Sequence, residues 1–129
     1  MLDFNHAMIY TRDVARALGF YRDLLGLTVL EEFRGGGRLV YARLQAPGGQ
    51  STIALHLMPP SEPLHTGGVR LYFEIRELEK VCRDLEAAGA KFSKPPAKMP
   101  WGWTHAYLDD PDGHEISLYW AGPDRLKKV

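Results

Sequence analysis

The order of a strand, a helix and a glycine occurs twice in this chain of 129 residues. Residues 6–11 alternate in polarity as a strand does, and apolar residues then recur over 14–25 at the spacing of one helix face. Residues 69–89 repeat this order, and His6 corresponds to Arg70 at an offset of 64 (70 minus 6). A duplication of this length predicts two similar modules.

The ends of the two expected helices carry recognisable signals. Asp13 is placed to cap the first helix, because its carboxylate can accept bonds from free backbone N–H groups. Gly26 and Gly89 can adopt the left-handed conformation that is common just after a helix. Cys82 falls on the apolar face of the second helix, where we expect it to be buried.

Three further strands are expected in each half of the chain. In the first half they are 27–33, 38–45 and 51–58, and in the second half they are 91–92, 103–108 and 115–120. Turns are expected at 34–37, 47–49 and 110–113. Residues 59–68 contain three prolines and two glycines, which predicts a linker without regular structure.

These elements predict an α+β fold of two βαβββ modules that form a curved, antiparallel-rich mixed sheet around a cleft. Module 1 covers 4–58 and module 2 covers 69–120, with the linker at 59–68. Together they form one domain, 1–122, followed by a C-terminal tail at 123–129. One helix covers only one face of each sheet, so we expect the two uncovered faces to line the cleft.

Composition limits the partners of the chain. Lys plus Arg and Asp plus Glu both number 16, so the net charge is zero and binding to nucleic acid through bulk charge is not expected. Its one cysteine excludes an intrachain disulfide, and no apolar run is long enough to cross a bilayer. We expect a cytoplasmic protein with a small-molecule ligand and no membrane partner.

Three segments carry a family resemblance, namely 6–27, the PWGW sequence at 100–103, and the DDPDGHEISLYW sequence at 109–120. They resemble the vicinal oxygen chelate superfamily, which contains glyoxalase I, bleomycin-resistance proteins, fosfomycin-resistance enzymes and extradiol dioxygenases. The likeness covers about residues 6–122. It implies a glyoxalase-like fold, a homodimer in many members, and a divalent metal held in the cleft. Whether the cleft forms within one chain or between two chains is left open.

The resemblance implies metal ligands at four positions. His6 occupies the first position, and His56 is assigned to the second. Arg70 stands where the family usually has a histidine, and Ser117 stands where it usually has a glutamate. Glu115 shares the strand face of Ser117 and is a substitute ligand or catalytic group.

His6 and His56 are therefore the candidate metal ligands, because neutral imidazole binds Zn, Fe, Ni, Co or Mn. Arg70 is a permanent cation that would repel a dication. Without a metal, Arg70 and the histidines would favour an anionic ligand, and a histidine can act as an acid or base near neutral pH. The candidate catalytic residues are His6, His56, Arg70 and Glu115.

Aromatic and apolar side chains are expected to form the walls of the pocket. The candidate substrate-binding residues are Met8, Tyr10, Tyr72, Trp101, Trp103 and Ser117. Trp103, His105 and Tyr107 share one face of a strand, but the sequence does not show which face points inward. His114 lies beside a turn and is expected to be solvated.

These residues leave three candidate functions open. The first is a metal-dependent lyase, isomerase or dioxygenase that acts on a small oxygen-rich substrate, with the metal as Lewis acid. The second is a metal-free binding protein of the bleomycin-resistance type, which sequesters a small molecule. The third is a metal-free acid–base enzyme in which Arg70 holds an anionic substrate.

Overall fold

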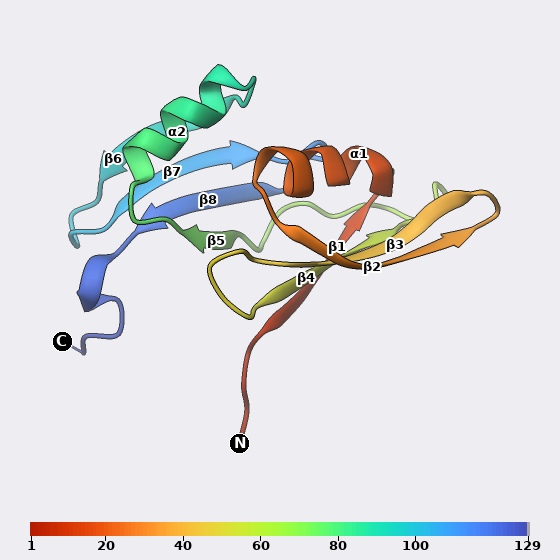
Figure 1. Cartoon of the computed structure of the whole chain (residues 1–129), viewed down its shortest axis with the longest axis horizontal. Coiled ribbons are helices and arrows are strands. Elements are labelled where there is room, and N and C mark those ends of the chain that lie inside the picture. Colours follow the sequence, from red (N-terminus) through yellow and green to blue (C-terminus); the bar gives the residue numbers. More distant parts are fainter. Residues whose placement is uncertain (129) are drawn as a thin grey trace. The chain divides into compact units, whose positions relative to one another are not determined.

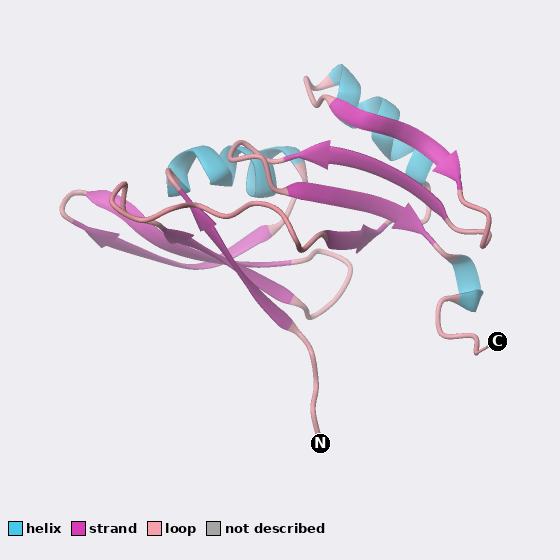
Figure 2. Cartoon of the chain, turned by 180° about the vertical axis from the view of Figure 1, so that it is seen from behind, coloured by secondary structure: helices cyan, strands magenta, loops and turns pink. Residues whose placement is uncertain are grey.

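The computed structural model describes residues 1–128, which fall into two compact units, Met1–His65 and Thr66–Val129. The boundary between the units lies inside the predicted linker 59–68, which contains no helix or strand. Figures 1 and 2 show the two units from opposite sides. That they act as one domain over 1–122 stays a prediction. The last residue of the predicted tail 123–129 lies outside the described residues.

The first unit contains one helical segment and four strands. In chain order these are β1 (His6–Thr11), α1 (Val14–Leu18), the π-helix η1 (Gly19–Leu24), β2 (Thr28–Gly35), β3 (Arg38–Gln45) and β4 (Thr52–Leu57). The strand order is β1-β4-β3-β2. β1 runs parallel to β4, and the other neighbours are antiparallel.

The second unit repeats this plan. It contains β5 (Leu71–Glu74), α2 (Leu78–Ala87), β6 (Phe92–Lys98), β7 (Thr104–Asp109) and β8 (Glu115–Trp120), followed by a 3-10 helix η2 (Gly122–Asp124). The strand order is β5-β8-β7-β6, and again the first and last strands pair in parallel. The predicted α+β fold of two βαβββ modules with mixed sheets is confirmed. No helix in the described part of the chain has the length and apolar character needed to cross a bilayer.

Each helix packs on one face of its own sheet, as Figure 1 shows for α1 and α2. The face below α1 carries the buried side chains Ala42, Leu44, Ile53 and Leu55, and the face below α2 carries Ala106, Leu108, Ile116 and Leu118. Burial of such leucine and isoleucine side chains contributes about 1.5–3 kcal/mol each. Polar and aromatic residues therefore occupy the opposite faces, which the helices leave uncovered.

The predicted start of the first helix is observed, whereas one predicted strand has different bounds in the structure. The Asp13 side chain accepts a bond from the Arg16 N–H at 3.1 Å, which confirms the predicted cap. The strand expected at 91–92 instead runs over Phe92–Lys98 and includes Pro95 and Pro96. β6 is an edge strand with two irregularities in its register, so prolines that cannot donate hydrogen bonds are tolerated there.

Candidate functional site

In the first unit, the sheet face opposite α1 carries three of the predicted site residues. Along β1, Ile9 and Thr11 are buried while His6, Met8 and Tyr10 are exposed. Successive strand residues point to opposite faces, so these three side chains share the uncovered face.

His6 and His56 share that face but lie far apart along it. The parallel register sets His6 opposite Thr52 and Tyr10 opposite His56. The two histidines are thus separated by four residues along the strands, which corresponds to about 13 Å at about 3.3 Å per residue. The structure does not bring the two imidazoles together at one point.

Local contacts hold each imidazole at its own end of the face. The Nδ1 atom of His6 lies 2.7 Å from the Thr52 hydroxyl oxygen. The Nδ1 atom of His56 lies 2.9 Å from the carbonyl oxygen of Leu57, and its ring centroid lies 5.6 Å from that of Tyr10. Both contacts use Nδ1, so it is the separation along the strands, and not these contacts, that argues against a shared metal ion.

The internal repeat shows which residue of β4 corresponds to Ser117. Met8 pairs with Ala54, and its counterpart Tyr72 pairs with Ser117. Ala54 therefore takes the equivalent position in the first unit, two residues before His56. An alanine side chain has no metal-binding atom, so the second expected ligand position carries no donor.

Arg70 and Glu115 form an ion pair at the start of the equivalent face in the second unit. Arg70 also donates to the Tyr72 hydroxyl at 3.4 Å, and its guanidinium carbon lies 4.9 Å from the centre of the Tyr107 ring. Glu115 is thus engaged by a cation, which makes it a poor candidate for completing a metal shell.

Ser117 lies next in the same row, fully buried between Tyr72 on β5 and Tyr107 on β7. Its hydroxyl oxygen is 3.5 Å from Nδ1 of His105. His105 pairs with Tyr119 across β7 and β8, so its side chain lies on the uncovered face, the alternative that the sequence left open.

Five aromatic rings surround His105, and we call this group the aromatic cluster. Its members are His105, Tyr72, Trp101, Trp103, Tyr107 and Tyr119, with ring centroids 5.4–6.1 Å from that of His105. Trp103 is stacked on His105 with an interplanar angle of 16°, while Trp101 meets it edge-on at 84°. The predicted pocket walls Tyr72, Trp101 and Trp103 therefore gather in one place.

His105 is an unusual member of the cluster because it is 3% exposed and its Nε2 atom has no hydrogen-bond partner. Burial, and secondly the positive charge of Arg70, lower the pKa of its imidazole below the ordinary value. His105 is therefore neutral near pH 7, and one of its ring nitrogens is available to a ligand.

The residues at the four family positions do not fit a divalent metal. They are His6, Ala54, Arg70 and Ser117, of which only His6 offers a strong donor. Arg70 adds a permanent positive charge where a cation would lie. We therefore derive no chemical step through a metal at these positions.

A second group of possible metal ligands lies in the turn between β7 and β8. Donor atoms of Asp110, Asp112 and His114 lie within 4.8 Å of one another. Asp110 Oδ1 accepts bonds at 2.9 Å from the backbone N–H groups of Asp112 and His114, and its Oδ2 lies 2.8 Å from His114 Nδ1. These bonds explain the cluster as a turn that Asp110 holds together. The expectation that His114 is solvated is wrong, since its side chain is 16% exposed.

The Asp110–His114 pair predicts a pH dependence of stability. The hydrogen bond to Asp110 raises the pKa of His114 above 6.5, so this contribution is complete below pH 6.5 and disappears as the pH rises through the folded-state pKa. We expect urea unfolding to show a stability loss above pH 6.5 that is absent in His114→Gln. The lowered pKa of His105 has the opposite effect on stability, which it reduces as the pH falls. This effect acts below pH 6.5, outside the window of His114. If the free energy of unfolding changed with pH equally in the wild-type protein and in His114→Gln, the pH dependence could not be assigned to the Asp110–His114 pair.

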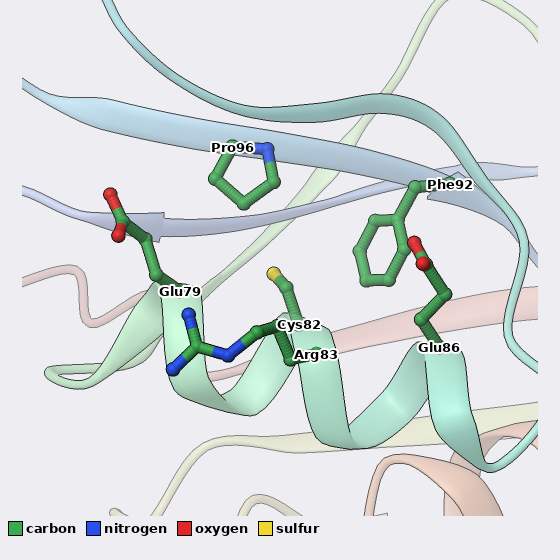
Figure 3. Close-up of a pocket in the computed structure, with 6 residues that line it drawn as sticks. All are labelled: Glu79, Cys82, Arg83, Glu86, Phe92 and Pro96. Atoms are coloured by element: carbon green, nitrogen blue, oxygen red, sulfur yellow. The ribbon is translucent and has the colours of Figure 1, made fainter.

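A hollow of about 350 Å³ lies between α2 and β6. Figure 3 shows the residues that line it, which are Glu79, Cys82, Arg83, Glu86, Phe92 and Pro96. Cys82 is buried, as predicted, and burial raises the pKa of its thiol to about 11. The thiol is therefore protonated near neutral pH, and none of the predicted site residues lines this hollow.

Residues 3–118 match the Glyoxalase/Bleomycin resistance protein/Dioxygenase superfamily. The chain belongs to this family. This glyoxalase-family chain is 28% identical over 120 residues to the uncharacterized protein YaeR of Escherichia coli, covering 89% of this chain and 93% of that one. It is 26% identical over 119 residues to a probable lactoylglutathione lyase of Synechocystis, covering 88% of this chain and 91% of that one.

Solved structures of the family have the same fold. A superfamily member from Sphaerobacter thermophilus matches with a TM-score of 0.74 and 28% identity, over 92% of this chain and 98% of that one. TnmS3, an antibiotic-binding protein from a Streptomyces species, matches with a TM-score of 0.77 and 23% identity, over 95% and 98%. At this identity the TnmS3 match shows the fold alone.

Proposed function

We propose that this glyoxalase-family chain is a binding protein that holds a small planar aromatic molecule against the aromatic cluster, without a metal ion. The observation that carries the proposal is the cluster itself, which gathers five aromatic rings and a neutral histidine on the uncovered face of one sheet. Trp101 and Tyr72 are exposed, so they offer ring surface to a ligand. Stacking on such rings favours flat aromatic ligands over aliphatic ones.

The charges beside the cluster favour an anionic substituent on that ligand. Arg70 and Lys94 both lie over the Tyr107 ring, at 4.9 and 5.5 Å from its centre. Glu115 balances only one of these two cations. A sulfonate or carboxylate on the ligand would gain charge-assisted hydrogen bonds from them.

Metal-dependent catalysis of the lyase, isomerase or dioxygenase type is the second candidate. The relative named as a probable lactoylglutathione lyase favours it. It requires His6 and His56 to share an ion, although four residues separate them along the strands. A metal-free acid–base reaction with Arg70 as the anion holder is a third possibility, and the predicted cleft, homodimer and cytoplasmic location also stay predictions.

The binding proposal predicts that anthracene-2-sulfonate, a flat aromatic anion, quenches tryptophan fluorescence saturably. We expect the dissociation constant to be the same within about twofold with and without EDTA, since no metal takes part. Trp103→Ala should weaken binding by about tenfold or more, because one stacking partner is worth about 1–3 kcal/mol. The measurement is a fluorescence titration checked by calorimetry.

Trp120→Ala is the matched control, because Trp120 lies on β8 next to the cluster but outside it and packs with Arg76. It should leave the dissociation constant unchanged. Absence of saturable binding to the wild-type protein would contradict the proposal. Stoichiometric metal in protein purified without chelator, together with loss of binding in EDTA, would support the second candidate instead.

A further inference from the structure

The unpartnered Nε2 atom of His105 indicates what kind of ligand the aromatic cluster selects. Buried polar atoms in folded proteins almost always have a hydrogen-bond partner. Among the described residues, Nε2 of His105 is the buried side-chain nitrogen or oxygen atom that lacks one. Its other ring nitrogen is satisfied, by the Tyr107 hydroxyl at 3.2 Å and the Ser117 hydroxyl at 3.5 Å. A ligand group is the partner that the site lacks.

The role of Nε2 depends on which ring nitrogen of the neutral imidazole carries the proton. Two hydroxyl groups, those of Tyr107 and Ser117, lie 3.2 and 3.5 Å from Nδ1, and each has a proton that it can donate. When Nδ1 accepts from one of them, the proton of the neutral imidazole is on Nε2, which is then a donor.

We infer that the Nε2–H of His105 donates a hydrogen bond to a carbonyl oxygen on the edge of the aromatic ligand. The ligand class is therefore a planar aromatic carbonyl compound, such as a quinone with an acidic substituent. This inference rests on the proposed binding function and adds the group that the site recognises.

Trp101 provides the route by which a ligand reaches His105. Its ring stands edge-on to the imidazole at 5.8 Å, and the residue is 63% exposed. It lies in the turn between β6 and β7, next to Gly102, which has a φ of 98°. We expect a ligand to reach the imidazole by displacing this exposed ring.

The test compares anthraquinone-2-sulfonate with anthracene-2-sulfonate, two flat anions that differ in the ring carbonyls. We expect the wild-type protein to bind the quinone about tenfold more tightly, because only the quinone gives the buried N–H a partner. In His105→Phe the ratio of the two dissociation constants should fall to within about twofold of one. His65→Phe, at an exposed linker position, should keep the wild-type ratio.

The outcomes separate this inference from the proposed function. If the wild-type protein binds both anions with equal affinity, the role of His105 is overturned while the binding function stands. If it binds neither anion, the proposed function itself fails. Equal quinone preference in the wild type and in His105→Phe would also overturn the assignment.

Nuclear magnetic resonance can determine the tautomer of His105 in the wild-type protein, so this test does not require that a variant folds. Long-range ¹H–¹⁵N spectra of the wild-type protein should show His105 as the Nε2–H tautomer, and the Nε2 signal should shift when anthraquinone-2-sulfonate binds. The Nδ1–H tautomer would overturn the inference. Tyr107→Phe removes the hydroxyl that donates to Nδ1, so it should reduce the preference for the Nε2–H form.

Discussion

Tyr21→Ala is expected to lower the free energy of unfolding by about 3–5 kcal/mol, as truncation of a buried aromatic ring does. Tyr21 is 0% exposed and lies on the π-helix that continues α1. Its ring meets Phe20 edge-on, with centroids 4.9 Å apart. Removing it leaves a cavity in the core of the first unit that the packed neighbours cannot fill. Urea unfolding followed by circular dichroism would measure the change.

Tyr10→Ala is the matched control, because it deletes the same side chain from the opposite side of the first sheet. Tyr10 is 43% exposed and contacts the His56 ring. We expect a cost below about 1.5 kcal/mol, in the ordinary range for partly exposed positions. If Tyr10→Ala were as destabilising as Tyr21→Ala, the division into a core face and an uncovered face would be wrong.

The fold could be predicted because its signals are local. The offset of 64 that relates His6 to Arg70 also relates Val14 to Leu78, the residues at which α1 and α2 begin. Period-2 and period-3.6 patterns depend on neighbours a few residues away, which the sequence displays directly. The length of the edge strand β6 was not predicted beyond Phe92, because its prolines argue against a strand and only its place at the sheet edge makes them tolerable.

The position of His56 could not be deduced from its own strand. Which residue of β4 lies nearest to His6 depends on the register of two strands separated by more than forty residues. The sequence indicates that His6 and His56 share a face, which is correct, but it does not measure their separation along it. The observed register puts Ala54 where a ligand was expected.

The inward face of β7 could not be deduced from the turn that was expected after it. A four-residue turn at 110–113 would set Asp109 opposite His114 and would place His105 opposite Leu118, on the face below α2. In the structure five residues, 110–114, separate Asp109 from its partner Glu115, and His105 lies opposite Tyr119. A difference of one residue in the turn therefore decides whether His105 belongs to the site.

Asp110→Ala is expected to lower the free energy of unfolding by about 3 kcal/mol, which is large for a residue in a turn. The Asp110 side chain is 1% exposed and accepts two backbone N–H bonds besides its contact with His114. Without the carboxylate, the backbone N–H groups of Asp112 and His114 lose their acceptor. The turn between β7 and β8 then lacks the hydrogen bonds that fix its conformation. Since β8 carries Ser117 and Tyr119, we also expect weaker binding of the aromatic probe.

Two variants test the cause of this loss. Asp110→Asn keeps an oxygen for the backbone N–H groups but removes the negative charge near His114, so it should cost about half as much. Asp109→Ala, an exposed neighbour, should cost less than about 0.5 kcal/mol. The same ranking in EDTA would support hydrogen bonding as the cause. If EDTA destabilised the wild-type protein but not Asp110→Ala, the turn would be a cation site, and the explanation by hydrogen bonds would be wrong.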